Sequence, residues 1–251
     1  MHGISSWIKQ YAVKNNLKAL IIGISGGIDS ALVSTLCAET GLPTYVISLP
    51  IKQKKDQLIR AQNHAKWLLK KYDNVVFIEK DLTLLYQKFE NSIEKQYKTE
   101  LSLANSKSRL RMVTLYQYAG SLGGLVVGTG NKVEDFGVGF YTKYGDGGVD
   151  ISPIADLYKT EVRNLGKFLE VDDEIINAAP TDGLWDDNRN DETQIGATYE
   201  ELEWVMELGL EKFSYTEKEH KVVETYKKFH EKNKHKMVSI PIFDLKEHEI
   251  I

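Results

Sequence analysis

Short apolar runs and longer stretches of helical periodicity alternate along the first half of the chain. The apolar runs are rich in Ile, Leu and Val, as expected of buried strands, and cover residues 16–25, 44–50, 74–82 and 124–130. The stretches with helical spacing cover residues 29–40, 55–72, 82–97 and 103–121. Strands that alternate with helices pair in parallel through right-handed crossovers. The pattern therefore predicts an α/β fold, a doubly wound and mostly parallel sheet flanked by helices.

The texture of the chain changes after Thr129. Residues 128–162 are dense in Gly and Asp and poorly periodic, which is typical of a long functional loop, and their aromatic residues argue against disorder. A helix is expected at about 157–168, a second irregular and acidic segment at 180–193, and a charged helix from Thr216 to about Asn233. Because no repeat or low-complexity linker interrupts the chain, we expect residues 1–251 to form a single domain.

Composition excludes several classes of protein. The net charge of −4 over 251 residues gives no support for a general nucleic-acid surface. The apolar run 19–24 is too short to span a bilayer and lies too far into the chain, without a cleavage pattern, for a signal peptide. The single cysteine, Cys37, excludes an internal disulfide and a cysteine-cluster metal site. We expect a cytoplasmic protein without nucleic-acid or membrane partners.

The first strand-to-helix turn has the sequence GISGGIDS, residues 23–30. Ligands of open α/β sheets bind beyond the carboxyl ends of the strands, so this turn is the first candidate site. Gly26 and Gly27 accept backbone angles that other residues avoid, and the backbone amides at the start of the following helix favour anions. Ser25 and Ser30 add hydroxyl groups. These features predict a phosphate-binding loop rather than a plain tight turn.

Two common phosphate loops do not match this turn. The Walker A pattern requires a lysine after its second glycine, and the dinucleotide fingerprint requires G-x-G-x-x-G; neither occurs here. What remains is S-G-G-x-D-S, with the Asp29 carboxylate beside the expected anion. A carboxylate next to phosphates requires a cation between them, and Mg²⁺ is the natural choice. The loop therefore suits pyrophosphate that leaves when ATP is attacked at its α-phosphorus.

At this point the chain resembles a known superfamily, the ATP pyrophosphatases that adenylylate a substrate, which include GMP, asparagine and NAD synthetases. The loop SGGIDS carries only that superfamily resemblance. The stretches FYTKYGDGGVDISPI, PTDGLWDDNRNDETQIG, NSKSRLRM and HKM are similar to the NAD synthetase family in particular, and the likeness covers nearly the whole chain. The resemblance implies a Rossmann-like fold of the adenine-nucleotide alpha-hydrolase type.

The family's reaction is the ATP-dependent amidation of deamido-NAD (nicotinic acid adenine dinucleotide) to NAD. ATP activates the nicotinate carboxylate as an acyl-adenylate, pyrophosphate leaves, ammonia attacks, and AMP is released. Adenylylation supplies the leaving group that a carboxylate lacks, so the enzyme's share is positioning and charge stabilisation. The resemblance thus implies a ligase of NAD biosynthesis with ATP as co-substrate and Mg²⁺ as cofactor.

Residue by residue, the resemblance assigns three sets of candidates. The ATP set is Gly23, Ile24, Ser25, Gly26, Gly27, Ile28, Asp29, Ser30, Thr129, Lys159 and Thr181. The deamido-NAD set is Arg109, Lys143, Asp150, His235 and Lys236. The metal set is Asp29 and Glu134. We predict Asp29, Asp146 and Lys159 as the catalytic residues.

Several of these assignments have alternatives. The segment after Glu134 is one residue longer than the family pattern, so Asp135 could replace Glu134 as the second metal ligand. Asp146 could orient or deprotonate ammonium, or it could simply form an Asp-Gly turn. Arg111 is two residues from Arg109 on the same predicted helix and should face elsewhere, which makes it a weaker candidate.

Two acids and the cysteine complete the set. Asp191 and Glu192 match a family loop but receive no role. Cys37 lies among apolar residues of a predicted helix, so a packing role is expected.

The chain has no room for a glutaminase domain and no second cysteine to serve one, which favours free ammonia as nitrogen donor. The resemblance also implies a homodimer, and the aromatic-rich helices between Tyr97 and Tyr118 could form its interface.

Two rival interpretations stand beside this one. The first is another ATP pyrophosphatase that amidates or thiolates a nucleotide or a tRNA base; it would favour reactive cysteines or a basic face, and neither is evident. The second is a nucleotide-binding sensor without catalysis, which has no need for a metal on the pyrophosphate side. Asp29 and the lysines argue against the sensor.

Overall fold

The computed structural model describes residues 2–181, 183–185, 189–211 and 214–243. Within these residues the helices and strands follow one another along the chain. They are α1 (His2–Lys14), β1 (Leu20–Gly23), α2 (Ile28–Ala38), β2 (Thr44–Ser48), α3 (Lys55–Lys71), β3 (Val75–Glu79), α4 (Thr83–Ser92), α5 (Glu100–Leu122), β4 (Leu125–Val126), η2 (Val133–Val138), α6 (Lys159–Phe168), α7 (Asp173–Ile176), α8 (Asp191–Ile195), α9 (Tyr199–Glu207) and α10 (Glu217–Met237). Short 3₁₀ turns occur at Lys95–Tyr97 and Gly209–Glu211.

The described strands form one parallel sheet in the order β3-β2-β1-β4. The chain leaves β1 toward β2 and β3, then crosses back to place β4 on the other side of β1. The doubly wound, mostly parallel sheet predicted from the sequence is thus confirmed. The strand order reverses between β1 and β4, and loops at such a reversal separate to leave room for a ligand.

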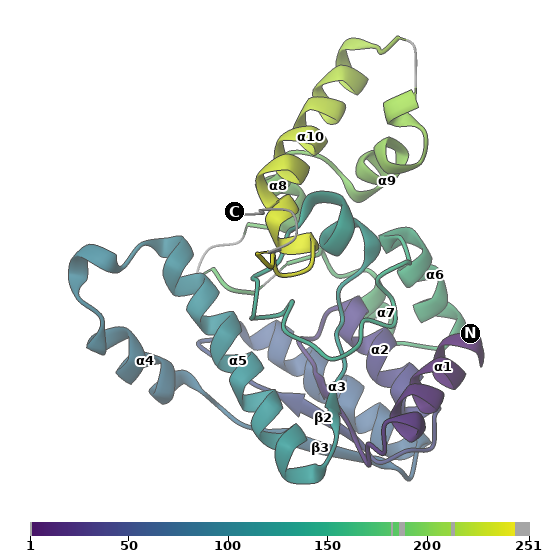
Figure 1. Cartoon of the computed structure of the whole chain (residues 1–251). Helices are drawn as coiled ribbons and strands as arrows, with labels where there is room; N and C mark the ends of the chain where they lie inside the picture. Colours follow the sequence, from purple (N-terminus) through teal and green to yellow (C-terminus); the bar gives the residue numbers. More distant parts are fainter. Residues whose placement is uncertain (1, 182, 186–188, 212–213, 244–251) are drawn as a thin grey trace, which may run out of the picture.

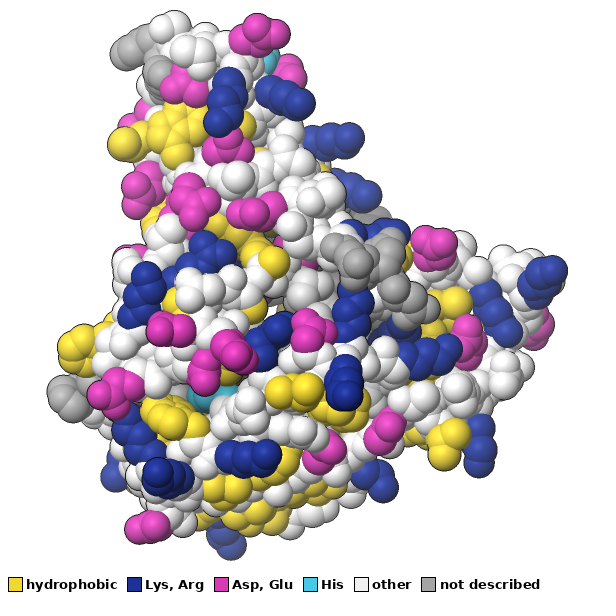
Figure 2. All heavy atoms as spheres, turned by 180° about the vertical axis from the view of Figure 1, so that it is seen from behind, with side chains coloured by type: hydrophobic (Ala, Val, Ile, Leu, Met, Phe, Trp, Pro, Cys, Tyr) yellow, Lys and Arg dark blue, Asp and Glu magenta, His cyan; other side chains and the backbone are white. Residues whose placement is uncertain are grey.

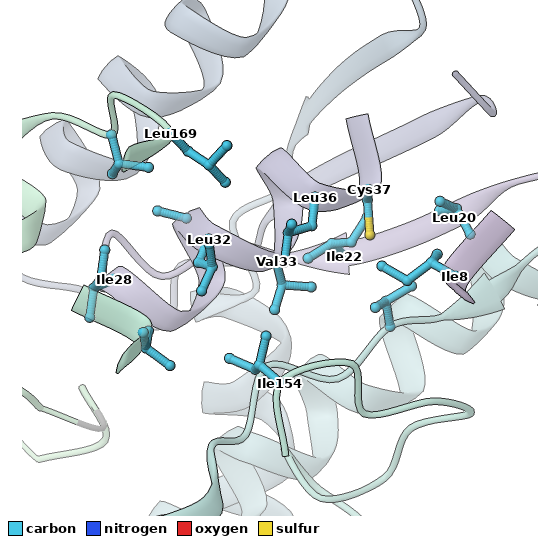
Figure 3. Packing of buried hydrophobic residues seen from close by; sticks show 14 of the residues in the cluster. Ile8, Leu20, Ile22, Ile28, Leu32, Val33, Leu36, Cys37, Ile154 and Leu169 are labelled. Carbon is cyan, nitrogen blue, oxygen red and sulfur yellow. The ribbon is translucent and has the colours of Figure 1, made fainter. Parts of the chain in front are cut away.

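Successive residues of β1 pack on opposite faces of the sheet. Leu20 and Ile22 pack against α1, α2 and α6, while Ile21 packs with residues of α4 and α5. Both faces are therefore covered, which explains why the strand reads as a continuous apolar run rather than as an alternation. Figure 3 shows the cluster on the α2 side, with the Cys37 sulfur inside it. Cys37 is fully buried in this cluster, which confirms its predicted packing role. The same burial raises the pKa of its thiol.

A second apolar cluster lies apart from the sheet. It joins η2, α8, α9 and α10, with Val133, Tyr199 and Leu202 fully buried. Figure 1 shows α9 and α10 standing away from the sheet at the opposite end from β2 and β3. This lobe approaches the sheet through η2 and α6, the two elements that carry Glu134 and Lys159.

The structure differs from the predicted elements in several places. α4 ends at Ser92, α5 begins at Glu100, and the fourth strand pairs over only two residues before Val127 forms an isolated bridge with Ile151. The segment predicted as irregular after Thr129 contains η2, a π-helix. The segment predicted as irregular at 180–193 lies partly outside the described residues.

On the face shown in Figure 2, acidic and basic side chains are interspersed rather than gathered into a basic stripe. None of the described helices combines the length and apolar character that crossing a membrane requires.

Candidate active site

The phosphate loop predicted at residues 23–30 lies at the carboxyl end of β1 and leads directly into α2. Gly26 has φ +83°, and a Cβ there would lie 2.4 Å from the carbonyl oxygen of Gln57. Gly27 has φ −97°, an ordinary extended conformation, so only Gly26 needs the backbone freedom expected of both glycines. No side chain caps α2 at Gly27, and the amides of its first turn point beyond the strands.

The two serine hydroxyls organise the loop itself. Ser30 Oγ donates to the Gly27 carbonyl at 3.0 Å and accepts from the Ser25 amide at 3.2 Å. Ser25 Oγ accepts from the Gly27 amide at 3.2 Å. These bonds within the loop fix its conformation, as a preorganised anion site requires.

A cavity of about 270 Å³ opens beside this loop. All eight residues from Gly23 to Ser30 line it, and so do Thr129, Lys159 and Thr181. The whole predicted ATP set thus surrounds one cavity, although its members come from four separate parts of the chain. Glu134, Asp135 and Asp146 line the same cavity.

An ionic triad lies at the inner wall of the cavity. Lys159 Nζ lies 2.6 Å from Asp29 Oδ2 and 3.0 Å from Glu134 Oε1. The Lys159 side chain is 3% exposed, and the two carboxylates are 17% and 18% exposed. Residues separated by as many as 130 positions therefore meet through one ammonium group.

Two neighbours hold the carboxylates of the triad in place. Asn131 Nδ2 donates to Asp29 Oδ1 at 3.0 Å, and the Tyr199 hydroxyl donates to Glu134 Oε1 at 2.6 Å. The Tyr199 ring also lies 4.8 Å from Lys159 Nζ, within range of a cation–π contact. Neither residue was predicted from the sequence: Asn131 stands in a loop dense in Gly and Asp, and Tyr199 reads as an ordinary apolar helix position.

Burial and charge act in opposite directions on the triad. Burial alone would lower the pKa of Lys159, but Asp29 and Glu134 raise it above the usual lysine value. Burial raises the pKa of Glu134, and the opposing charge of Lys159 only partly offsets this. Burial and the neighbouring Glu134 charge raise the pKa of Tyr199 well above its ordinary value. At neutral pH Lys159 is therefore a cation and Tyr199 a neutral hydrogen-bond donor.

The π-helix η2 places the two adjacent acids differently. A π-helix takes up one more residue per hydrogen-bonded turn than an α-helix, and this element overlaps the segment after Glu134 that was expected from the sequence to be one residue longer than the family pattern. Glu134 reaches Lys159, while the Asp135 carboxylate packs against Gly130, where a Cβ would lie 2.2 Å from its Oδ1. Burial, followed by the charges of Glu134, Asp146 and Asp29, raises the pKa of Asp135 to about 8.

Asp146 lines the cavity and also closes a turn. Its Oδ1 accepts from Ser108 Oγ at 2.7 Å and from the Thr142 amide at 3.0 Å, and its own amide donates to Ser108 Oγ. Both interpretations made from the sequence are compatible with this geometry, because the carboxylate both organises the loop and faces the cavity.

Four of the five predicted substrate residues gather in a cationic patch outside the cavity lining. Arg109 Nε donates to the Lys143 carbonyl at 3.3 Å, and Lys143 Nζ donates to the His235 carbonyl at 3.0 Å. Lys236 Nζ donates to the carbonyls of Gly139 and Tyr141, at 2.7 Å for the latter. The patch of Arg109, Lys143, His235 and Lys236 lies next to the cavity, because Lys236 bonds to the carbonyl of Tyr141, which lines it.

The fifth predicted substrate residue, Asp150, lies apart from this patch. Its Oδ1 accepts from the Tyr116 hydroxyl at 2.9 Å, and its Oδ2 accepts from the Val126 amide at 2.7 Å. Asp150 therefore links its own loop to α5 through Tyr116 and to β4 through Val126.

One sequence expectation about this region needs correction. His235 and Lys236 lie in the last turn of α10, which continues to Met237, and not past its end.

Arg111, the weaker candidate of the two arginines, lines the cavity, whereas Arg109 lies outside its lining. Arg111 Nε donates to the Leu49 carbonyl at 2.9 Å and Nη2 to Gln53 Oε1 at 3.0 Å. The two arginines therefore have different surroundings, as their spacing predicts.

The structure also supplies positions for Asp191 and Glu192. Asp191 is buried, lines the cavity, and its amide donates to the Pro180 carbonyl at 3.0 Å. Glu192 Oε1 accepts from the Tyr199 amide at 3.0 Å. Glu192 thus fixes the first residue of α9, whose side chain holds Glu134.

Comparisons with known proteins were made on the whole chain. A family model described as NAD synthase matches residues 1–239. The NH(3)-dependent NAD(+) synthetase of Finegoldia magna is 39% identical over 201 residues, which cover 80% of each chain. The solved structure of an NMN synthetase from Francisella tularensis superposes with a TM-score of 0.86 at 30% identity and covers 97% of this chain and 96% of that one. An NH3-dependent NAD synthetase from Campylobacter jejuni superposes with a TM-score of 0.77 at 26% identity, covering 97% of each chain.

Proposed function

The chain belongs to the NAD synthase family, and from this premise we propose that it amidates deamido-NAD to NAD with ammonia and ATP. It is a ligase that forms a C–N bond through an acyl-adenylate and releases AMP and pyrophosphate in the last step of NAD biosynthesis. The observation that carries the proposal is the meeting of Asp29, Glu134 and Lys159 at the wall of a cavity formed by the phosphate loop.

ATP occupies the cavity in this proposal. The amides and ordered hydroxyls of Gly23–Ser30 bind the phosphates, with Thr129 and Thr181 on the walls. Lys159 reaches the polyphosphate and stabilises charge on the departing pyrophosphate. Arg111 adds a guanidinium to the cavity wall, held by the Leu49 carbonyl and Gln53.

The donor set at the triad fits Mg²⁺. Asp29 and Glu134 are the hard oxygen ligands that Mg²⁺ prefers, and among the described residues no group of three or more His, Cys, Asp or Glu side chains could hold a metal by itself. Such a pair suits a cation that arrives with nucleotide phosphates. Glu134 is proposed as the second ligand rather than Asp135, because Glu134 shares Lys159 with Asp29. When bound, the cation neutralises charge on the phosphates.

The nicotinate end of the substrate lies toward Asp146 and the cationic patch. Arg109, Lys143 and Lys236 supply positive charge for the substrate's phosphates, His235 supplies a ring nitrogen for hydrogen bonding, and Asp150 supplies an acceptor. Asp146 faces the cavity and orients or deprotonates ammonium for attack on the acyl-adenylate.

A second candidate substrate follows from one comparison. The Francisella tularensis structure, named an NMN synthetase, has the higher TM-score of the two structures compared. Amidation occurs at the nicotinate carboxylate, which the acid mononucleotide and the acid dinucleotide share, so the triad serves either substrate. The two differ only in the adenylate half, which must find its own binding surface.

The product assay tests this function directly. Purified protein with ATP, Mg²⁺ and ammonium is given deamido-NAD or nicotinic acid mononucleotide in parallel, and NAD, NMN, AMP and pyrophosphate are measured. We expect AMP and pyrophosphate in equal amounts, with kcat/KM for deamido-NAD at least about tenfold higher, which corresponds to about 1.4 kcal/mol of transition-state binding. A ratio below one would assign the mononucleotide as substrate. Release of ADP and phosphate would refute the adenylylation chemistry.

We also propose that the protein is a homodimer, in the cytoplasm and as one domain over residues 1–251. Support for the dimer comes from α4, α5 and the 3₁₀ turn between them, where large apolar side chains are exposed. They are Leu84, Leu85, Phe89, Tyr97, Leu101 and Val113. Figure 1 shows α4 projecting away from the body of the molecule, which exposes this surface for contact. An exposed apolar surface of this kind is typical of an interface with another chain.

Leu101→Glu is expected to convert the dimer to monomer. Leu101 is 59% exposed on α5, and a carboxylate buried in an apolar interface costs several kcal/mol. Light scattering after size exclusion at micromolar concentration measures the mass. Val13→Glu is the matched control, because Val13 is equally exposed at 59% but lies on α1. A monomeric wild type, or equal dissociation of both variants, would contradict the proposed interface.

A further inference from the structure

Lys159 bridges the two residues proposed as metal ligands. Its ammonium lies within 3.0 Å of a carboxylate oxygen of each, and its side chain is 3% exposed. A cation that binds Asp29 and Glu134 together would take up the position between these carboxylates that the ammonium holds. This overlap of ammonium and cation rests on the proposed function, under which Asp29 and Glu134 are the metal ligands.

Contacts within α6 and from α9 fix the position of Lys159. Lys159 is the first residue of α6, and Glu203 of α9 fixes the next residue, accepting from the Thr160 amide at 3.0 Å and the Thr160 hydroxyl at 2.7 Å. The Tyr199 ring covers the ammonium at 4.8 Å. The ammonium is therefore held at the carboxylates by two helices, and its location is not a chance rotamer of a surface lysine.

Charge makes the lysine and a divalent cation alternatives at this place. Two carboxylates that share a poorly hydrated wall repel each other, and one cation between them removes most of that repulsion. A second cation added at the same spot would meet the ammonium at a separation of a few Å and would be repelled by it. The polyphosphate of ATP offers the ammonium a new anion within the same cavity.

We propose that Lys159 is the internal counter-ion of the metal site and competes with the divalent cation for Asp29 and Glu134. The lysine leaves these carboxylates for the polyphosphate when nucleotide enters the cavity, and this exchange makes the carboxylates available to the cation. The protein therefore binds the metal alone weakly, and metal and nucleotide bind together. In this way Lys159 couples two binding events as well as stabilising the phosphates.

The test measures Mn²⁺ binding in the absence of nucleotide. Mn²⁺ accepts the same oxygen ligands as Mg²⁺, and free Mn²⁺ is counted by its paramagnetic resonance signal during titration. The central variant is Lys159→Gln, whose amide still donates hydrogen bonds to a carboxylate but carries no charge. Lys132→Gln is the matched control, because Lys132 pairs with Asp156 at 3.0 Å on the surface and stacks over Tyr158 at 4.8 Å.

The expected result is Mn²⁺ affinity at least about tenfold higher in Lys159→Gln than in wild type, because a unit positive charge is removed from within about 4 Å of the ion. Lys132→Gln should bind Mn²⁺ as wild type does. Thermal unfolding supplies a second measurement: Lys159→Gln should melt below wild type in EDTA and regain the difference when Mn²⁺ is added, because the ion then pairs the carboxylates. Unchanged or weaker Mn²⁺ binding in Lys159→Gln, without Mn²⁺-dependent recovery of Tm, would overturn the inference.

A double variant separates this inference from the proposed function. Adding Asp29→Asn to Lys159→Gln should remove the gained Mn²⁺ affinity, because one of the two ligands loses its charge. If the gain persists in the double variant, Mn²⁺ binds elsewhere, and both the metal site and the inference fall. If single Lys159→Gln shows no gain while wild type still forms NAD in the product assay, the inference alone is overturned.

Discussion

Asp29→Asn is expected to lower kcat/KM for the amidation reaction by a factor on the order of a thousand or more. Asp29 is the one side chain of the phosphate loop that pairs with Lys159, at 2.6 Å, and it is also a proposed metal ligand. Asparagine preserves the shape and the contact with Asn131 but removes the charge that holds both cations in place. Loss of preorganised charge stabilisation at a reacting phosphate has effects of this size. The measurement is steady-state release of pyrophosphate with deamido-NAD and ammonium.

The control for Asp29→Asn is Asp156→Asn. Asp156 also pairs with a lysine, Lys132 at 3.0 Å, but it is 96% exposed and lies outside the cavity. Its replacement should leave turnover within about twofold of wild type, since exposed ion pairs contribute little. Circular dichroism should show that both variants are folded. Turnover near the wild-type value in folded Asp29→Asn would refute the role given to this carboxylate.

Gly26→Ala is the second change with a large expected effect, and it acts on stability and ATP binding together. Gly26 has φ +83°, and an alanine Cβ would lie 2.4 Å from the Gln57 carbonyl oxygen and 3.2 Å from the Ala61 amide nitrogen. Both contacts are backbone atoms of α3, so the loop itself must move. Strain and displacement together should cost about 3 kcal/mol of unfolding free energy. Urea denaturation measures the loss, and ATP binding should become undetectable by calorimetry.

Gly41→Ala isolates the conformational part of this effect. Gly41 has φ +73°, but within the described part of the chain no atom beyond its two neighbours in sequence lies within 4 Å of a Cβ placed there. Its replacement should cost only about 1 kcal/mol, the strain of the left-handed conformation alone, and should leave ATP binding intact. Equal losses of stability in the two variants would show that the clash with α3 has no effect.

The sheet and the phosphate loop were predictable because their signals are local. β1 and β2 are paired on both sides and largely buried, so each reads as a short apolar run, and the glycine cluster after β1 marks the turn. β3 pairs with β2 alone, and its run of apolar residues is only partly buried. The predicted fourth strand was longer than the observed one, because beyond Val126 the chain pairs with Ile151 through the isolated bridge at Val127. A contact with a residue so much later in the chain leaves no trace in local hydrophobic periodicity.

The candidate ATP set was predictable from motifs, whereas the residues that hold it were not. Tyr199 donates a hydrogen bond to Glu134, and Glu203 accepts one from Thr160, the residue after Lys159. Both contacts span tens of residues, and neither Tyr199 nor Glu203 stands in a recognisable sequence pattern. The spacing of Arg109 and Arg111 shows that they face different ways, but only the packing of α5 against β1 and β4 decides that Arg111 is the one that lines the cavity.

The ionic triad has a consequence for how the protein becomes competent during synthesis. Asp29 and Lys159 are 130 residues apart, and Tyr199 lies 65 residues beyond the Glu134 that it holds. Chains are made from the N-terminus, so the phosphate loop emerges from the ribosome long before α6 and α9. A nascent chain therefore carries an ATP loop without the lysine and tyrosine that complete the site. The nucleotide site is therefore complete only after the lobe of α8, α9 and α10 has folded, and an unfinished chain cannot catalyse the reaction of ATP.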